Sequence, residues 1–129
     1  MVGRNNHSRM VLSAILGTYG IAEFSLQGNI LKANQNFADI LGCARDQLIG
    51  KLHSVLIRPE PNQQSEPPVS ERRFWLALLR GETQFGRFHA TTDNGNSVWF
   101  SASYCPLKTN LGKVTRILSI VHLNQAIVA

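Results

Sequence analysis

Apolar positions near the N-terminus recur with the period of a helix. Ser8 can cap such a helix and Gly17 can end it, so we predict a helix over residues 9–16. Residues 1–6 precede it as a polar lead-in that we expect to be partly disordered. The apolar residues of the helix share one face: Met10, Val11, Ala14 and Ile15.

In the next part of the chain, short strand patterns alternate with short helical ones. Residues 19–26 and 30–32 predict two strands joined by a turn at Gln27-Gly28-Asn29. Asn34 lies where the second strand gives way to a helix, and its side chain can cap that helix. The helix has an apolar stripe that ends at Gly42: Phe37, Ile40 and Leu41. Residues 45–50 predict one more helical turn, and residues 51–57 a short apolar helix or turn.

A proline-rich segment at residues 59–68 separates this region from a longer helical stripe. The segment holds four of the five prolines and predicts a surface loop that is too short to divide two domains. The helix that follows ends at Arg80-Gly81. Its apolar stripe consists of Phe74, Trp75, Leu78 and Leu79.

The last third of the chain has the pattern of strands. Residues 84–92, 97–107 and 114–123 are rich in aromatic and β-branched residues, and residues 93–96 and 109–113 are strong hairpin signals. We therefore predict an α+β fold, in which a five-stranded antiparallel sheet carries short helices on one face and a flanking helix at its N-terminus. The expected divisions are a lead-in and flanking helix at 1–18, the domain at 19–123 and a tail at 124–129.

The final strand is apolar on both faces. Ile117, Val121 and Leu123 alternate with a second apolar set: Val114, Leu118 and Ile120. A sheet of this kind needs cover on both sides, and the short helices supply it on one side only. We therefore expect the N-terminal stripe or a partner chain to cover the outer face, and we predict a homodimer or a contact with the remainder of a receptor.

Composition changes this picture little. The chain has 129 residues and a formal net charge of +5, but its Lys and Arg residues are scattered, so we expect a solvated basic surface and no nucleic-acid partner. No apolar stretch is long enough to cross a bilayer, and the N-terminus does not resemble a signal peptide. We expect a cytoplasmic domain without direct membrane insertion, in which Cys43 and Cys105 are packed, reduced thiols.

Several short motifs stand in the order found in PAS domains, the sensory modules of bacterial signalling proteins. The matching residues run from about Tyr19 to Leu123: Phe24-Ser25-Leu26-Gln27-Gly28-Asn29-Ile30, Ala33-Asn34-Gln35-Asn36-Phe37, Leu41-Gly42, Leu48-Ile49-Gly50-Lys51 with His53, residues 74–82, Asp93-Asn94-Gly95, Val98-Trp99-Phe100, Ser103-Tyr104-Cys105-Pro106 and Gly112-Lys113-Val114. The chain resembles most the PAS domains of chemotaxis and aerotaxis receptors and of biofilm-dispersal sensors. This resemblance implies a pocket between sheet and helices that holds FAD or another flavin, haem, a small metabolite or nothing.

The resemblance also yields candidate binding residues, each with a structural alternative. Asn34 is favoured as a helix cap over a ligand contact, and Trp75 as helix-to-sheet packing over stacking on a flavin. Trp99 either touches a ligand or covers the sheet. Arg58 belongs to a partial match to the basic-and-proline motif of flavin-binding aerotaxis domains, but the His-Pro pair of that motif is missing.

Two histidines are candidate haem ligands. His53, in the short helix, and His89, in a strand, would bind the iron only if haem is present. A packed or surface position is favoured for His53, and a surface position over one in the pocket for His89. His122, also in a strand, is expected at the surface. Cys43 does not stand in the motif of flavin-adduct photosensors and is expected in the core.

No catalytic motif is visible in the sequence. It has no nucleophile elbow, no His-Glu-x-x-His pair and no phosphate-binding glycine loop, so we do not expect an enzyme. Two functions remain: a sensory module that binds a ligand or cofactor and relays a change to the output domain of its receptor, and a cofactor-free module for dimerisation or partner binding.

Overall fold

The computed structural model describes residues 2–59 and 67–123. The helices are α1 (Val2–Thr18), α2 (Gln35–Leu41), α3 (Arg45–Leu48), α4 (His53–Leu56) and α5 (Pro67–Leu79). The strands are β1 (Gly20–Phe24), β2 (Ile30–Ala33), β3 (Ile57–Pro59), β4 (Gln84–Thr91), β5 (Ser97–Lys108) and β6 (Val114–Leu123). The predicted tail at 124–129 and most of the predicted loop, residues 60–66, lie outside the described residues.

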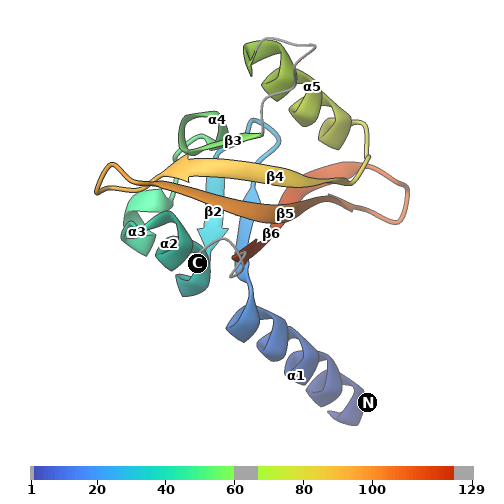
Figure 1. Ribbon diagram of the computed structural model, residues 1–129. Coiled ribbons are helices and arrows are strands. Elements are labelled where there is room, and N and C mark those ends of the chain that lie inside the picture. Colours follow the sequence, from blue (N-terminus) through green and yellow to red (C-terminus); the bar gives the residue numbers. More distant parts are fainter. Residues whose placement is uncertain (1, 60–66, 124–129) are drawn as a thin grey trace.

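The strands form one curved antiparallel sheet in the order β2-β1-β6-β5-β4-β3 (Figure 1). The predicted α+β class is confirmed, but within the described residues the sheet has six strands where the sequence predicted five. The additional strand is β3, which pairs with β4 from Ile57↔Ala90 to Pro59↔Phe88. Three residues are too few to show a period of two, and the sequence pattern assigned Ile57 to the preceding helix or turn.

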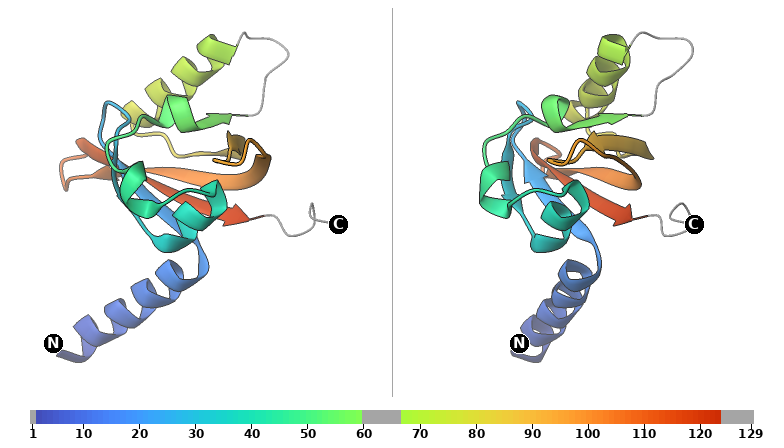
Figure 2. Two further views of the ribbon diagram at one scale, coloured as in Figure 1. Left: turned by 90° about the vertical axis from the view of Figure 1, so that its left-hand side faces the viewer. Right: turned by 60° about the vertical axis from the view of Figure 1, so that its left-hand side comes forward.

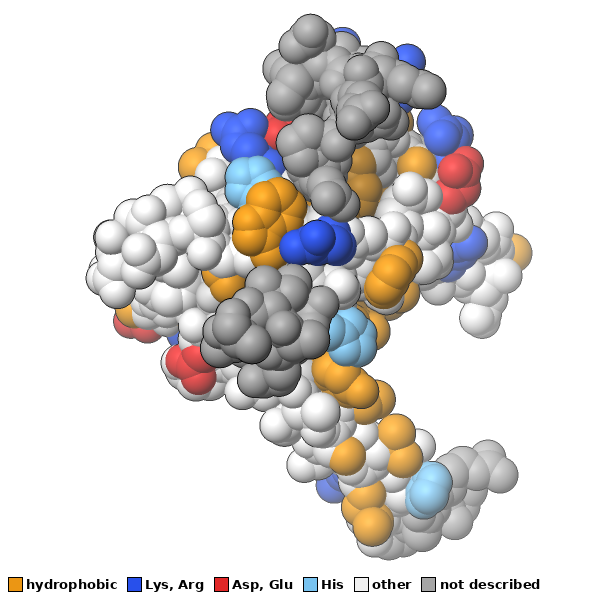
Figure 3. Space-filling model, viewed as in Figure 1, with side chains coloured by type: hydrophobic (Ala, Val, Ile, Leu, Met, Phe, Trp, Pro, Cys, Tyr) orange, Lys and Arg blue, Asp and Glu red, His pale blue; other side chains and the backbone are white. Residues whose placement is uncertain are grey.

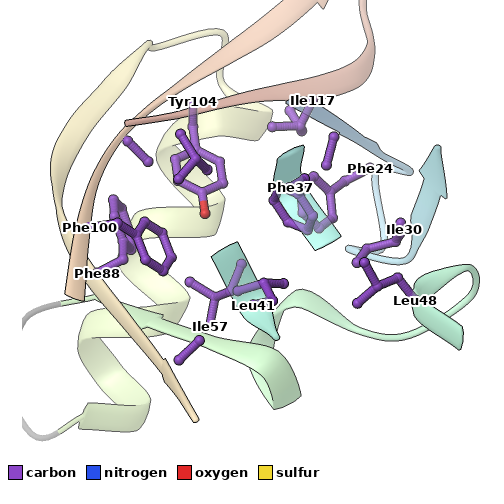
Figure 4. Packing of buried hydrophobic residues seen from close by; sticks show 14 of the residues in the cluster. Phe24, Ile30, Phe37, Leu41, Leu48, Ile57, Phe88, Phe100, Tyr104 and Ile117 are labelled. Carbon is purple, nitrogen blue, oxygen red and sulfur yellow. The ribbon is translucent and has the colours of Figure 1, made fainter. Parts of the chain in front are cut away.

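The helices α2 to α5 lie against one face of the sheet (Figures 1 and 2). Contacts join α2 to β1, α3 to β2 and α4 to β3, whereas α5 reaches β3, β4 and β5. Between these helices and the sheet lies a single hydrophobic core (Figure 4). Its largest fully buried side chains are Tyr104, Phe24, Phe37, Phe100, Ile30, Leu48, Ile57, Leu78, Ile117 and Val121.

Strict alternation along the central strands determines which side chains enter this core. On β5, Phe100, Ala102 and Tyr104 are buried, and the residues between them are only half-buried on the outer face. Ile117, Ser119 and Val121 continue the inner face on β6. Because the side-chain period of a strand is two, a shift of one residue would expose this whole set.

The α2 helix has the boundaries that its sequence predicts. Asn34 is the N-cap, and its Oδ1 accepts a hydrogen bond from the Phe37 N–H at 2.9 Å. Gly42 follows the helix with φ 69°, a left-handed conformation that glycine adopts without steric cost. A Cβ on Gly42 would lie 2.9 Å from the Thr92 Cβ. Close packing and backbone conformation therefore both require glycine at this position.

The N-terminal helix differs from its prediction in length and in position. It extends from Val2 to Thr18, through the predicted polar lead-in and past Gly17, which does not end it. It also points away from the sheet rather than covering its outer face (Figures 1 and 2). Several apolar side chains of α1 are therefore exposed: Met10, Val11, Leu12, Ile15 and Leu16. The α1 stripe therefore does not cover the outer face, and the second cover that the sequence allowed, a partner chain, stays a prediction.

Candidate ligand-binding site

A pocket of about 400 Å³ opens between α4, α5 and the turn that follows β1. Its volume falls within the range of small-molecule sites. The residues that line it are Gln27, Gly28, Leu52, His53, Ser54, Glu71, Arg72, Phe74 and Trp75. Leu52 and the two aromatic rings supply apolar walls, and the polar side chains apart from His53 lie towards the surface. This combination suits a small, mainly apolar ligand.

His53 forms the buried end of the pocket. Its side chain is only 5% exposed, although it lies at the start of a one-turn helix. Its ring centroid lies 5.2–5.7 Å from four aromatic rings. Those rings belong to Phe24, Phe74, Trp75 and Tyr104. The packed position favoured from sequence is therefore the one observed.

A buried hydrogen bond joins the pocket to the centre of the sheet. His53 Nε2 lies 2.7 Å from the Tyr104 hydroxyl, which comes from the central strand β5. Burial lowers the pKa of His53 to about 3, and it raises the pKa of Tyr104 above its ordinary value. Both groups are therefore uncharged near neutral pH, and the buried pair carries no net charge.

Trp75 anchors α5 to the turn between β1 and β2. Its Nε1–H donates to the Leu26 carbonyl oxygen at 2.8 Å, and its ring packs 3.6 Å from the position of a Cβ on Gly28. Gly28 has φ 92°, so it also provides the left-handed turn conformation. Trp75 is thus both a pocket wall and the helix-to-sheet contact that the sequence favoured.

Charged side chains lie at the mouth of the pocket. Arg58 donates to Glu71 Oε1 at 2.8 Å, and Glu71 itself lines the pocket beside Arg72. Arg58 is thus close to the pocket, but its guanidinium forms an ion pair with Glu71. The Arg58 side chain is 52% exposed. Its predicted contact with a flavin stays a prediction.

Asn34 lies outside this pocket, at the junction of α1 with the domain. Its Oδ1 accepts from the N–H groups of Ile21 and Phe37, both at 2.9 Å. Its Nδ2 donates to the carbonyl oxygens of Leu16 and Tyr19, at 3.0 and 2.9 Å. Two acceptor and two donor bonds use the whole capacity of an amide. The predicted cap is confirmed; a ligand contact of Asn34 stays a prediction.

Trp99 and His89 lie on the opposite face of the sheet from His53. They face each other across β4 and β5, with ring centroids 4.8 Å apart, and Arg87 stacks over the Trp99 ring at 5.0 Å. On the face of the molecule drawn in Figure 3, a histidine, a hydrophobic side chain and a basic side chain lie side by side. Of the five predicted binding residues, the structure therefore brings together His53 and Trp75, with Arg58 nearby, but not Asn34 or Trp99.

The described residues do not fit a haem site. His53 Nε2 is occupied by the Tyr104 hydroxyl, and aromatic rings surround the imidazole on several sides. His89 faces the other side of the sheet. Within residues 2–59 and 67–123, no cluster of three metal-binding side chains occurs, and no helix is long and apolar enough to cross a membrane. For a flavin, the flat Phe74 and Trp75 rings would form a stacking surface, with Arg58 turned towards Glu71.

Sequence reasoning missed Tyr104 and Ser119 as partners of the site. Tyr104 is far from His53 in sequence, and only the inward alternation of Phe100, Ala102 and Tyr104 signals that it enters the core. Ser119 is fully buried beside it, in register across β5 and β6. A polar residue on the inner face of an apolar strand is the signal that would have identified Ser119.

These features define the class of the protein. A family model described as "PAS domain" matches residues 19–122. The chain belongs to the PAS domain family.

Two curated relatives make the assignment more specific. The chain is 36% identical over 106 residues to the biofilm dispersion protein BdlA of Pseudomonas aeruginosa. The aligned region covers 82% of this chain and 24% of BdlA. The chain is 27% identical over 95 residues to the aerotaxis receptor of Escherichia coli, covering 74% of this chain and 18% of the receptor. The chain thus spans a quarter or less of the relatives' length, so the similarity concerns a part of each relative and not the whole.

A solved structure shows the same fold at low sequence identity. The PAS domain of a protein from Colwellia psychrerythraea superposes with a TM-score of 0.70 and 17% identity, covering 92% of this chain and 97% of that domain. This likeness concerns the fold alone. Together the three comparisons confirm the resemblance to PAS domains of chemotaxis, aerotaxis and biofilm-dispersal proteins.

Proposed function

We propose that this chain is the sensory domain of a chemotaxis- or aerotaxis-type receptor and that it binds a small ligand or redox cofactor in the pocket above His53. The observation that carries the proposal is the hydrogen bond from the buried wall of a 400 Å³ pocket to the central strand β5. A ligand that contacts His53 would change the environment of Tyr104 through this buried hydrogen bond. Pocket and sheet are thus physically joined.

The signal would leave the domain through α1. The side chains of Asn34 and Asn36, at the start of α2, both donate to Leu16 O in the last turn of α1 and to Tyr19 O just after that helix. The exposed apolar side chains of α1 fit a second copy of the chain, and so do the apolar positions of β6 on the outer face. We therefore propose a homodimer through α1 and the outer sheet face, which relays a population shift to an output domain in the same receptor.

The proposal includes a non-catalytic role in the cytoplasm, with neither nucleic acid nor membrane as a direct partner. Its support is the similarity to a biofilm dispersion protein and an aerotaxis receptor, together with the PAS fold. A substrate-dependent turnover by the purified domain would contradict it.

One observation favours a second function, that of a cofactor-free interaction module. The space between sheet and helices is filled by the chain's own aromatic side chains, and Phe24, Phe88 and Tyr104 meet where a buried ligand would otherwise lie (Figure 4). In this alternative the α1 surface alone accounts for the role of the domain in dimerisation or partner binding.

The test is occupancy of the pocket in the purified protein and in a blocked variant. Absorbance identifies flavin or haem, and native mass spectrometry identifies a colourless ligand. Leu52→Trp, at the N-cap of α4, places a bulky ring in the pocket, and Val55→Trp, on α4 but outside the pocket, is the matched control. We expect a ligand in wild type and Val55→Trp and its loss in Leu52→Trp. A protein without ligand, whose receptor signals equally with Leu52→Trp, would establish the interaction module instead.

A further inference from the structure

A second pocket lies at the junction of α1 with the domain, where the end of α1, the helix α2 and the end of β6 meet (Figure 1). Its volume is about 400 Å³, which is also within the range of small-molecule sites. Among the described residues, it shares no lining side chain with the pocket above His53. This junction pocket is therefore a separate candidate site, next to the hydrogen bonds that hold α1.

Polar side chains of α1 and α2 in the junction pocket already use their hydrogen-bond donors. Asn36 donates through Nδ2 to the carbonyl oxygens of Leu16 and Tyr19, at 3.2 and 3.3 Å. Thr18 donates its hydroxyl proton to the Ala14 carbonyl oxygen at 2.7 Å. These groups therefore offer a ligand only acceptors, because a hydroxyl keeps its lone pairs and the amide keeps its Oδ1.

Two acceptor groups come from one side of α2. Asn36 and Asp39 both line the pocket, and a separation of three residues places them on the same face of the helix. Both partners of Asn36 Nδ2 are carbonyl oxygens, so the orientation of the amide is determined and Oδ1 is the end available to a ligand. One oxygen of the Asp39 carboxylate accepts from Gln35 Nε2 at 2.8 Å. The other oxygen accepts no hydrogen bond from the part of the chain that the structure describes.

The charge of the junction pocket is opposite to that of the whole chain. The formal net charge of the chain is +5, but the described residues that line this pocket include no Lys or Arg. Asp39 supplies the carboxylate of the site. A cationic ligand is therefore attracted to Asp39 without meeting the charge of a Lys or Arg in the wall, whereas a carboxylate or phosphate ligand is repelled.

Apolar and aromatic side chains complete the junction pocket. Val121 is 1% exposed and Ile40 is half-buried, and both line it. The rings of Tyr19 and His122 meet edge to face, with their centroids 4.7 Å apart. An aromatic ring and a carboxylate in one pocket together favour an ammonium group, since the face of the ring also attracts a cation. The two aliphatic side chains suit a short apolar group on the same ligand.

We propose that the junction pocket binds a small organic ammonium ion. The ammonium group donates to the Asp39 carboxylate and to Asn36 Oδ1, and the apolar group of the ligand packs against Ile40 and Val121. The three N–H donors of a primary ammonium group match acceptors that the fold leaves unused. This inference goes beyond the proposed function, and it does not require a ligand in the pocket above His53.

A ligand at this position acts on the attachment of α1. The Asn36 side chain bonds the ammonium ion through Oδ1 while Nδ2 donates to Leu16 O and Tyr19 O. These two bonds are longer than the bonds of Asn34 to the same oxygens, of 3.0 and 2.9 Å. An ion that holds Asn36 in this rotamer stabilises the weaker pair, so it restricts the motion of α1 relative to the sheet.

The probe for this site is isobutylammonium, and isobutanol is the matched ligand of similar shape without the charge. NMR titration of the full chain, read at the Asn36 side-chain amide, measures both dissociation constants. We expect isobutylammonium to bind at millimolar concentration and isobutanol to bind about fivefold more weakly, the contribution of an exposed charge pair. A shift of the Asn36 amide that does not saturate with isobutylammonium, or equal binding of isobutanol, overturns the site.

A matched pair of variants tests the role of the carboxylate. Asp39→Asn keeps the shape of the side chain and an acceptor for Gln35 but removes the charge, and should weaken isobutylammonium binding about fivefold. Asp46→Asn removes an exposed carboxylate of α3 outside the pocket and should leave binding unchanged. Equal binding by wild type and Asp39→Asn, or an equal loss in the two variants, overturns the assignment.

Two further measurements separate this inference from the proposed function. Leu52→Trp, which blocks the pocket above His53, should leave isobutylammonium binding unchanged. Loss of binding in Leu52→Trp but not in Asp39→Asn would place the ion in that other pocket and overturn the junction site. Hydrogen exchange of the amides in the last turn of α1 should slow when isobutylammonium is bound, and an unchanged rate overturns the effect on α1.

Discussion

His53 is an uncharged histidine in the folded domain at any pH at which the domain is expected to work. Its folded pKa of about 3 lies below the ordinary value of about 6.5 that it regains on unfolding. Between these values the unfolded chain binds the additional proton, so the stability contributed by His53 is present above pH 6.5 and is lost as the pH falls towards 3.

The first prediction is an acid-sensitive stability that depends on this one ring. Between pH 7 and pH 5 the free energy of unfolding should fall by about 2 kcal/mol more in wild type than in His53→Phe. Urea unfolding at the two pH values measures the difference. His7→Gln, which replaces an exposed histidine of α1, is the control and should retain the wild-type loss. An equal loss in His53→Phe would show that other groups cause it.

At the scale of elements, two helices are defined by specific contacts at their ends. The α2 helix begins at the Asn34 cap and ends at Gly42, and α1 ends where Asn34 and Asn36 donate to its carbonyls. These contacts are local in α2 but join α1 to a segment far along the chain. The sequence shows the cap, whereas the second task of Asn34 needs the tertiary structure.

The second prediction concerns this double role. Asn34→Ala removes the cap of α2 and the bonds to Ile21, Leu16 and Tyr19, and should lower the free energy of unfolding by about 2–3 kcal/mol. Asn36→Ala removes two longer bonds, of 3.2 and 3.3 Å, to carbonyls that Asn34 still contacts, and should cost about 1 kcal/mol or less. Chemical unfolding measures both, and hydrogen exchange at the end of α1 should increase in Asn34→Ala. Equal costs in the two variants would contradict the assignment.

The third prediction separates backbone strain from close packing at glycine. Gly42 and Gly50 both have positive φ, at 69° and 87°, but a Cβ would meet Thr92 only at Gly42 and would enter open space at Gly50. Gly50→Ala should cost about 1 kcal/mol for the backbone conformation. Gly42→Ala should cost at least about 1 kcal/mol more, because Thr92 must move. Melting temperatures or urea midpoints measure the difference. Equal costs in the two variants would show that Thr92 moves away from the added Cβ without loss of stability.

At the scale of the whole molecule, α1 makes few contacts with the rest of the domain. The core lies between the sheet and α2 to α5, and α1 contacts the rest mainly at α2 (Figures 1 and 2). A 17-residue helix without tertiary support is marginal in water. Its exposed apolar side chains therefore favour a partner, and the proposed homodimer provides one.

The fourth prediction tests the dimer through α1. Ile15→Glu places a charge on the apolar stripe, and Ser13→Glu places the same charge on the other side of the helix. Sedimentation over a micromolar concentration series should show a dimer in wild type and Ser13→Glu, and at least a tenfold weaker association in Ile15→Glu. A monomer at high micromolar concentration in wild type, or a domain lacking residues 1–18 that dimerises as the full chain does, would exclude the interface.

Strand alternation, hairpin signals and caps are local features, and the sequence alone determined them. The five longer strands, the α2 cap at Asn34 and the stop at Gly42 follow from residue types a few positions apart. The PAS assignment follows from the order of such local motifs along the chain. Strand pairing at these positions is fixed because a slip by one residue would expose the inner face. The candidate site was partly visible in the same way, since His53 and Trp75 lie in recognisable helical segments.

The rest was decided by contacts between distant segments. Only the folded chain shows that β3 pairs with β4, that α1 leaves the sheet uncovered, and that Trp99 and His89 lie on the face away from the pocket. The central case is His53, which is buried among aromatic rings from β1, α5 and β5, and whose pKa is lowered by that burial. No local pattern encodes this environment, because desolvation and hydrogen bonding arise where residues remote in sequence meet in one core.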